Sequence, residues 1–166
     1  AFALGDRGGV MRHGAVEQAG TPQELFNCPA NLYTASFVGA PPMNLVEDVP
    51  LQKKGGSWQV SLYGHSYVLP RGKCAGLTGR DHGRQVTLGI RPAYVAVGAG
   101  ELEATVDFWE VMGAELHLHL RVAGAALTAV APAAGLGVFA RGQKVAVGLP
   151  PQRFHLFDPK TEERIL

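Results

Sequence analysis

The stretch ELHLHLR, residues 115–121, constrains the fold more than any other part of this chain. Leucines alternate with charged residues and histidines, and this period of two places successive side chains on opposite faces of a β-strand. The pattern therefore predicts a strand with one buried and one solvated face. The residues expected inside are Leu116, Leu118 and Leu120, and those expected outside are Glu115, His117, His119 and Arg121.

Similar short segments follow one another from Leu45 onward. Strands are expected within residues 57–70 (two strands around Gly64-His65), 85–92, 101–109, 125–130, 144–149 and 153–157. The segment from Glu101 to Trp109 is expected to place Leu102, Ala104, Val106 and Phe108 on one face. The 22 glycines and 11 prolines suit turns between short strands. Eight or nine such strands predict a mainly β fold, built as a barrel or a compact sandwich.

The first 38 residues have a different character. Residues 1–6, AFALGD, are typical of the last turns of a helix, and residues 8–18 predict a hairpin with His13-Gly14 in its turn. Thr21 and Glu24 form a capping-box pattern around Pro22, which predicts the start of a short helix. A second short helix is expected to begin at Pro29, to bury Leu32, Tyr33 and Phe37, and to end at Gly39 before Pro41-Pro42.

Charge and composition disfavour several classes of protein. The net charge is +1 and the basic residues form no cluster, which argues against a nucleic-acid binder. No apolar run approaches the length of a membrane span. The two cysteines, Cys28 and Cys74, lie far apart and are expected to be reduced thiols rather than a disulfide framework.

The sequence predicts no catalytic motif. The segment RGKCAG contains a Gly-Lys pair, but a phosphate-binding loop needs glycine five residues before Gly72, where Tyr67 stands, and Ser or Thr where Cys74 stands. No nucleophile elbow is present. His117 and His119 have the spacing of two metal ligands on one strand face, yet no third ligand is evident. A solvated strand face explains this pair better, so no metal site is predicted.

Five residues are candidates for a regulatory or interface role. Arg91 ends an apolar strand before Pro92, where a guanidinium could organise a buried carboxylate or cap loop carbonyls. The aromatic candidates could anchor a partner, although packing in the core or at a barrel rim is the favoured interpretation for them. The full set is Arg91, Trp109, Glu110, Phe154 and Phe157.

Together these segments resemble a known family. Residues 10–44, VMRHGAVEQAGTPQELFNCPANLYTASFVGAPPMN, resemble the end of the nucleotide-binding domain and its exit linker in ATPase subunits of bacterial ABC importers. The similarity is to the carbohydrate-uptake branch, which includes the maltose and glycerol-3-phosphate importers. LGIRP at 88–92, WEVMGAELHLHLRV at 109–122 and GQKVAVGLPPQRFHLFDPKTEERI at 142–165 resemble the C-terminal regulatory domain of those subunits.

The resemblance implies two domains. Residues 1–38 would be the C-terminal remnant of the nucleotide-binding domain, and residues 39–166 an OB-type β-barrel regulatory domain. The ATP-site motifs, with the ATP and Mg that they bind, would lie upstream of Ala1, leaving no cofactor in this chain. One departure is Ala93, because the family usually has Glu after the Arg-Pro pair.

The expected function is a non-catalytic regulatory and dimerisation domain of an importer ATPase for sugars or related solutes. Its expected partners are a second copy, the membrane subunits and a regulatory protein, at the cytoplasmic face of the bacterial membrane. The alternative is a small-ligand module in which a cleft senses an oxyanion or a sugar. A pocket containing Arg, Lys or convergent N–H groups would favour the alternative.

Overall fold

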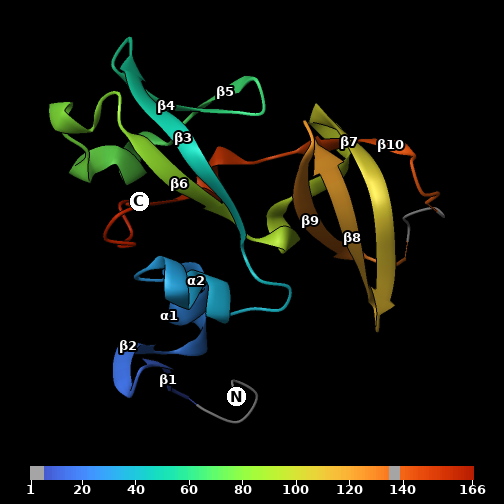
Figure 1. The fold of residues 1–166 in the computed structure, drawn as a ribbon, viewed down its shortest axis with the longest axis horizontal. Coiled ribbons are helices and arrows are strands. Elements are labelled where there is room, and N and C mark those ends of the chain that lie inside the picture. Colours follow the sequence, from blue (N-terminus) through green and yellow to red (C-terminus); the bar gives the residue numbers. More distant parts are fainter. Residues whose placement is uncertain (1–5, 135–138) are drawn as a thin grey trace.

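The computed structural model describes residues 6–134 and 139–166, and it contains two neighbouring β-sheets and a small N-terminal unit (Figure 1). The five-stranded sheet has the order β11-β6-β3-β4-β5, with β3 (Asn44–Lys54), β4 (Ser57–Leu62), β5 (His65–Val68), β6 (Gln85–Ile90) and β11 (His155–Phe157). The four-stranded sheet has the order β10-β7-β8-β9, with β7 (Ala96–Met112), β8 (Glu115–Val122), β9 (Ala125–Pro132) and β10 (Lys144–Gly148). The prediction of a mainly β fold is confirmed, although the described strands form separate sheets rather than one closed barrel.

The N-terminal unit consists of a hairpin and two short helices. Strands β1 (Gly8–Arg12) and β2 (Ala15–Gly20) pair antiparallel around His13 (φ 50°) and Gly14 (φ 78°), so both turn residues have the positive φ that tight hairpins favour. This turn is the one predicted from sequence. The expected helix at AFALGD lies outside the described residues, apart from Asp6.

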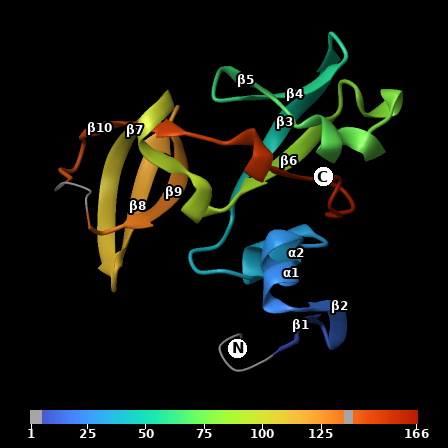
Figure 2. The ribbon, with the colours of Figure 1, turned by 180° about the vertical axis from the view of Figure 1, so that it is seen from behind.

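Helix α1 (Pro22–Asn27) begins as predicted. The Thr21 hydroxyl accepts from Glu24 N, and Glu24 accepts from Thr21 N, so each end of the capping box satisfies a main-chain donor of the other. Helices α1 and α2 (Leu32–Phe37) lie between the hairpin and the five-stranded sheet in both views (Figures 1 and 2).

Helix α2 (Leu32–Phe37) begins later than predicted. The side chain of Asn31 accepts from Thr34 N at 2.9 Å, so Asn31 caps the helix and it starts at Leu32 rather than at Pro29. The helix buries Ala35 on the face that points inward, which leaves Phe37 on the opposite side, 65% exposed. The expectation that Phe37 is buried was therefore wrong.

A β-bulge in β7 changes which side chains face the core. The register with β8 shifts between Val106 and Phe108, so Asp107 is the extra residue. Before the bulge, Leu102, Ala104 and Val106 are buried as predicted, but beyond it Trp109 packs towards the core and Phe108 is 53% exposed. The prediction that Phe108 lies on the buried face was wrong. An inserted residue reverses the faces of all the residues that follow it, and the alternation pattern does not reveal the insertion.

The turn between β4 and β5 also differs by one residue from the prediction. Tyr63 (φ 51°) and Gly64 (φ 79°) occupy the positive-φ positions, and His65 already belongs to β5.

The main hydrophobic core draws on both sheets. Leu51 and Leu88 come from the five-stranded sheet, while Leu118 and Leu127 come from the four-stranded sheet, and all four are at most 2% exposed. A smaller cluster of Val10, Leu25 and Val38 holds the N-terminal unit together. The boundary expected between residues 38 and 39 stays a prediction. Among the described helices, none is long and apolar enough to cross a membrane.

Candidate functional site

Arg91 joins the N-terminal unit to the five-stranded sheet. Its side chain leaves the end of β6 and is almost wholly buried, with 1% of the residue exposed. Nη1 donates to the carbonyl oxygens of Ala35, at 2.9 Å, and Val38, and Nη2 donates to that of Phe26 at 3.0 Å.

These three carbonyls lie at the C-terminal ends of the two short helices. The last carbonyls of a helix have no partner within it and carry partial negative charge, so a cation there is favourable. One guanidinium therefore caps both α1 and α2 from a strand that follows them by more than fifty residues. Arg91 therefore caps main-chain carbonyls, which is one of the two roles that the sequence suggested for it.

Local packing fits the guanidinium into this position. The Cζ atom of Arg91 lies 4.3 Å from the ring centroid of Phe26, a cation–π contact. Burial lowers the pKa of Arg91 to about 10, so the side chain remains charged at neutral pH. Its Nε has no hydrogen-bond partner among the described residues.

Gly39 makes room for Arg91. Its φ is +99°, and a Cβ at this position would lie 3.1 Å from Arg91 Nη1 and 3.3 Å from the Phe26 ring. Glycine is favoured here both by the backbone conformation and by the close approach of the guanidinium. The sequence suggested Gly39 only as a helix terminator.

Trp109 and Glu110 lie near the end of β7. Trp109 is half-buried against the main core, and Glu110 is exposed, with its carboxylate 3.3 Å from His119 Nε2. His119 also stacks on the exposed ring of Phe108, with centroids 4.1 Å apart. At the end of β7, Phe108 and Met112 are 53% and 55% exposed and lie on one face of the strand, whereas Val111, 65% exposed, lies on the other face. We call Phe108 and Met112 the β7 apolar strip.

His117 is not on an open strand face, contrary to the sequence prediction. It is 8% exposed, and its Nε2 lies 3.0 Å from the Glu115 carboxylate. The short 3-10 helix η3 (Pro92–Tyr94) packs against β9 beside it, which covers part of this face of the sheet. Among the described residues, no group of three His, Cys, Asp or Glu side chains is placed to hold a metal ion.

Phe154 and Phe157 lie in the interior of the chain, and each is 0% exposed. Phe154 makes an edge-to-face contact with Tyr67, at 5.4 Å between centroids. The interpretation of these two residues as interface anchors was wrong, because no atom of either ring is available to a partner. The packing interpretation is the correct one.

Two polar links between the sheets were not predicted. The Tyr67 hydroxyl donates to Glu101 Oε1 at 2.6 Å, and the same oxygen accepts from Leu149 N at 3.1 Å. Farther along, the side-chain amide of Asn44 both donates to the carbonyl of Thr128 and accepts from its N–H, at 2.8 and 2.9 Å. Asn44 thus pairs with the edge strand β9 as another strand would.

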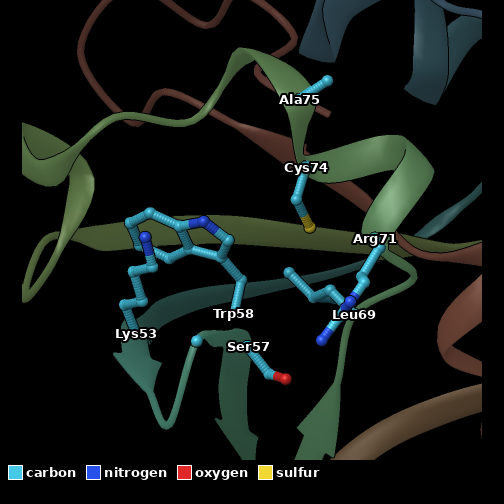
Figure 3. A pocket seen from close by; sticks show the side chains of 8 residues that line it. Lys53, Ser57, Trp58, Leu69, Arg71, Cys74 and Ala75 are labelled. Carbon is cyan, nitrogen blue, oxygen red and sulfur yellow. The ribbon is translucent and has the colours of Figure 1, made fainter.

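A cavity of about 350 Å³ opens beside β4, and Figure 3 shows the side chains that line it. Trp58, Leu69 and Cys74 are buried and form its apolar part. Two cations accompany them: Arg71, at the start of the 3-10 helix η1 (Arg71–Gly76), and Lys53, whose Nζ lies 5.8 Å from the Trp58 ring centroid. An indole next to two cations is suited to a small ligand with a flat or apolar body and negative charge.

The comparisons with known proteins agree on one relationship. Residues 88–157 match the family model of the TOBE domain. Across 99% of its length the chain is 36% identical to the sn-glycerol-3-phosphate import ATP-binding proteins UgpC of Ruegeria sp. (strain TM1040) and Salmonella typhi. It is 32% identical, again over 99%, to the sulfoquinovosyl glycerol transport ATP-binding protein SmoE of Agrobacterium fabrum. The chain spans 44–45% of the length of these relatives.

A solved structure shares the fold. The cytoplasmic molybdate-binding protein ModG, with molybdate bound, superposes with a TM-score of 0.52 and 16% identity. The match covers 70% of this chain and 96% of that one. At this identity the likeness concerns the fold alone.

Proposed function

We propose that this chain is a non-catalytic regulatory and dimerisation region of the ATP-binding subunit of a sugar-type ABC importer, because residues 88–157 match the TOBE domain model and the chain is 32–36% identical to importer ATP-binding proteins. The relatives are import ATP-binding proteins that are more than twice as long as this chain. In the proposal, residues 1–38 end the nucleotide-binding domain and residues 39–166 form the regulatory domain. ATP and Mg bind upstream of Ala1.

The observation that carries the proposal is the double helix cap by Arg91. A regulatory domain must be mechanically coupled to the domain that it regulates. Arg91 supplies such a coupling, because it extends from β6 and holds the C-terminal ends of both α1 and α2. A displacement of the five-stranded sheet would therefore move the N-terminal unit with it.

The proposed dimer contact is the β7 apolar strip. Large apolar side chains that protrude together from a strand mark a surface suited to a partner. Burying the strip against a second copy would raise the effective concentration of the two attached ATPase domains. The remaining proposed partners are the membrane subunits and a regulatory protein, at the cytoplasmic face of the membrane.

The coding DNA upstream of Ala1 provides the first test. We expect, in frame, a phosphate-binding loop, an LSGGQ-like signature and a switch histidine. A stop codon and start site next to Ala1 would contradict the importer proposal and favour a free-standing module.

The mass of the 166-residue chain in solution, measured by light scattering, tests the dimer. We expect a dimer, and we expect Phe108→Glu to shift it towards monomer because it places a carboxylate in the apolar strip. Val68→Glu is the matched control, since Val68 is 54% exposed on β5 and lies outside the strip. A wild-type chain that stays monomeric at high concentration would refute the dimer contact.

A second candidate function is a ligand sensor at the Trp58 cavity. The pairing of Lys53 and Arg71 with a buried indole favours it. Titrating sn-glycerol 3-phosphate and molybdate while following Trp58 fluorescence, with Trp109→Phe to remove the other indole, tests this candidate. A saturable change that is lost in Arg71→Gln would support the sensor over a purely mechanical domain.

A further inference from the structure

A second cavity, of about 370 Å³, lies where the N-terminal unit meets β11 and the last described residues. Four segments that are distant in sequence contribute to it: Cys28 follows α1, Lys73 lies in η1, His155 begins β11, and Arg164 lies near residue 166. In both views the last residues run between the five-stranded sheet and the helices (Figures 1 and 2).

The walls of this cavity are held by main-chain hydrogen bonds. Arg164 N donates to Ala30 O at 2.9 Å, which fixes the final segment against the residues after α1. Ile165 N donates to Leu156 O at 2.7 Å, and Leu156 N donates to Leu166 O at 3.0 Å, which fixes the same segment against β11. The cavity is therefore formed without a ligand.

Three basic side chains, Lys73, His155 and Arg164, line the cavity without an acidic side chain, and Leu166, which carries the terminal carboxylate of the 166-residue polypeptide, lines it as well. Neither Lys73 nor Arg164 takes part in an ion pair among the described residues, and Lys73 Nζ donates only to the carbonyl of Gln152. Lys73 and Arg164 carry like charges at this cavity, and a bound anion would offset their mutual repulsion.

The pKa values of two groups are lowered first by burial, and the neighbouring cations add to the lowering. Burial lowers the pKa of His155 to about 4, with further lowering by Lys73, Arg164 and Arg91. The pKa of Lys73 is also lowered, first by burial and then by Arg153 and Arg164. A bound anion would offset the part of the lowering that the neighbouring cations cause.

We propose that this cavity binds a small, doubly charged oxyanion, such as phosphate or the phosphate group of a small ester, between Lys73, His155 and Arg164. Lys73 and Arg164 supply charged donors, and the His155 imidazole supplies an N–H donor. Because Asn27 and Cys28 at the end of α1 line the same cavity, the bound anion lies between the N-terminal unit and the five-stranded sheet. The site does not depend on the dimer proposed above.

Inorganic phosphate is the probe for the test. We would titrate it at constant ionic strength, following the His155 imidazole signal by NMR and the alkylation rate of Cys28, which is exposed and lines the cavity. We expect a saturable shift of the His155 signal and slower alkylation of Cys28. The affinity should fall at least tenfold in Lys73→Gln and Arg164→Gln, because each removes one charge-assisted hydrogen bond.

Lys54→Gln is the matched control. It removes the same charge from the end of β3, outside the cavity, and should leave the affinity unchanged. Equal losses in Lys54→Gln and Lys73→Gln would mean unspecific attraction and would overturn the proposal.

A chain extended by two glycines after Leu166 is titrated in parallel. The extension moves the terminal carboxylate of the 166-residue polypeptide away from the cavity, where it would compete with phosphate. Absence of a saturable shift in both chains would also overturn the proposal, whatever the oligomeric state.

Discussion

Arg91 Nη1 donates a hydrogen bond to the main-chain oxygen of Ala35 across 2.9 Å, and 56 residues separate the two in sequence. This bond joins the end of a core strand to a helix outside that sheet. Its partners Val38 and Phe26 extend the contact to the C-terminal ends of both short helices.

Removing the guanidinium should loosen the N-terminal unit. Arg91→Met keeps much of the apolar stem but leaves three carbonyls without their donor, and we expect a loss of about 2–4 kcal/mol in the free energy of unfolding. Urea denaturation measures this loss, and hydrogen exchange should show faster exchange at α1 and α2. Arg141→Met, at an exposed position, is the control. Unchanged exchange in both helices would refute the capping role.

Gly39→Ala should disturb the same contact. The substitution combines a positive φ with a Cβ 3.1 Å from Arg91 Nη1. Gly64→Ala has a comparable φ of +79° but open space around its Cβ, so it measures the backbone cost alone, on the order of 1 kcal/mol. We expect Gly39→Ala to destabilise by more than this control, as judged from paired thermal melts. Equal costs would show that Arg91 can move aside freely.

The Tyr67–Glu101 bond should contribute stability that depends on pH. Partial burial opposes ionisation of Glu101, but hydrogen bonds from Tyr67 and from main-chain N–H groups outweigh it and lower its pKa. A carboxyl pKa that is lower in the folded state adds stability above the unfolded pKa, and this stability is lost as the pH falls through the folded pKa. Glu101→Gln should therefore be less stable than wild type at pH 7, with the difference shrinking below pH 4 in urea denaturation. Glu103→Gln, on the same strand and exposed, should show a much smaller difference.

His155 should add to the loss of stability in acid, at a higher pH than Glu101 does. Its pKa is about 4 in the folded chain against about 6.5 when unfolded, so the unfolded state binds the proton first. Stability is complete above pH 6.5 and declines between 6.5 and 4, by about 2 kcal/mol from pH 7 to pH 5. His155→Leu should flatten this part of the stability curve, while His13→Asn, in the exposed hairpin turn, should leave it unchanged. An unaltered slope in His155→Leu would contradict the assignment.

The sequence by itself determined the elements whose signals are local. The alternation at 115–121 placed β8, because a side chain's face follows from its position along the strand. The His13-Gly14 turn and the Thr21–Glu24 capping box were also readable, since each depends on residues within a few positions of one another. The same holds for the likeness of this chain to importer ATP-binding proteins, which is carried by contiguous segments.

Tertiary structure alone decided the features that depend on distant partners. The bulge at Asp107 turns Phe108 outward and Trp109 inward. The alternation of apolar and polar residues does not show where such an insertion occurs. His117 is buried although its strand pattern predicts an exposed position. The 3-10 helix η3 packs against β9 beside it, and this contact cannot be predicted from the sequence of β8. The convergence of Lys73, His155 and Arg164 on one cavity likewise required the last segment to fold back beside α1. Local pattern sets the direction of a side chain along its own element, and only packing brings residues from separate elements into contact.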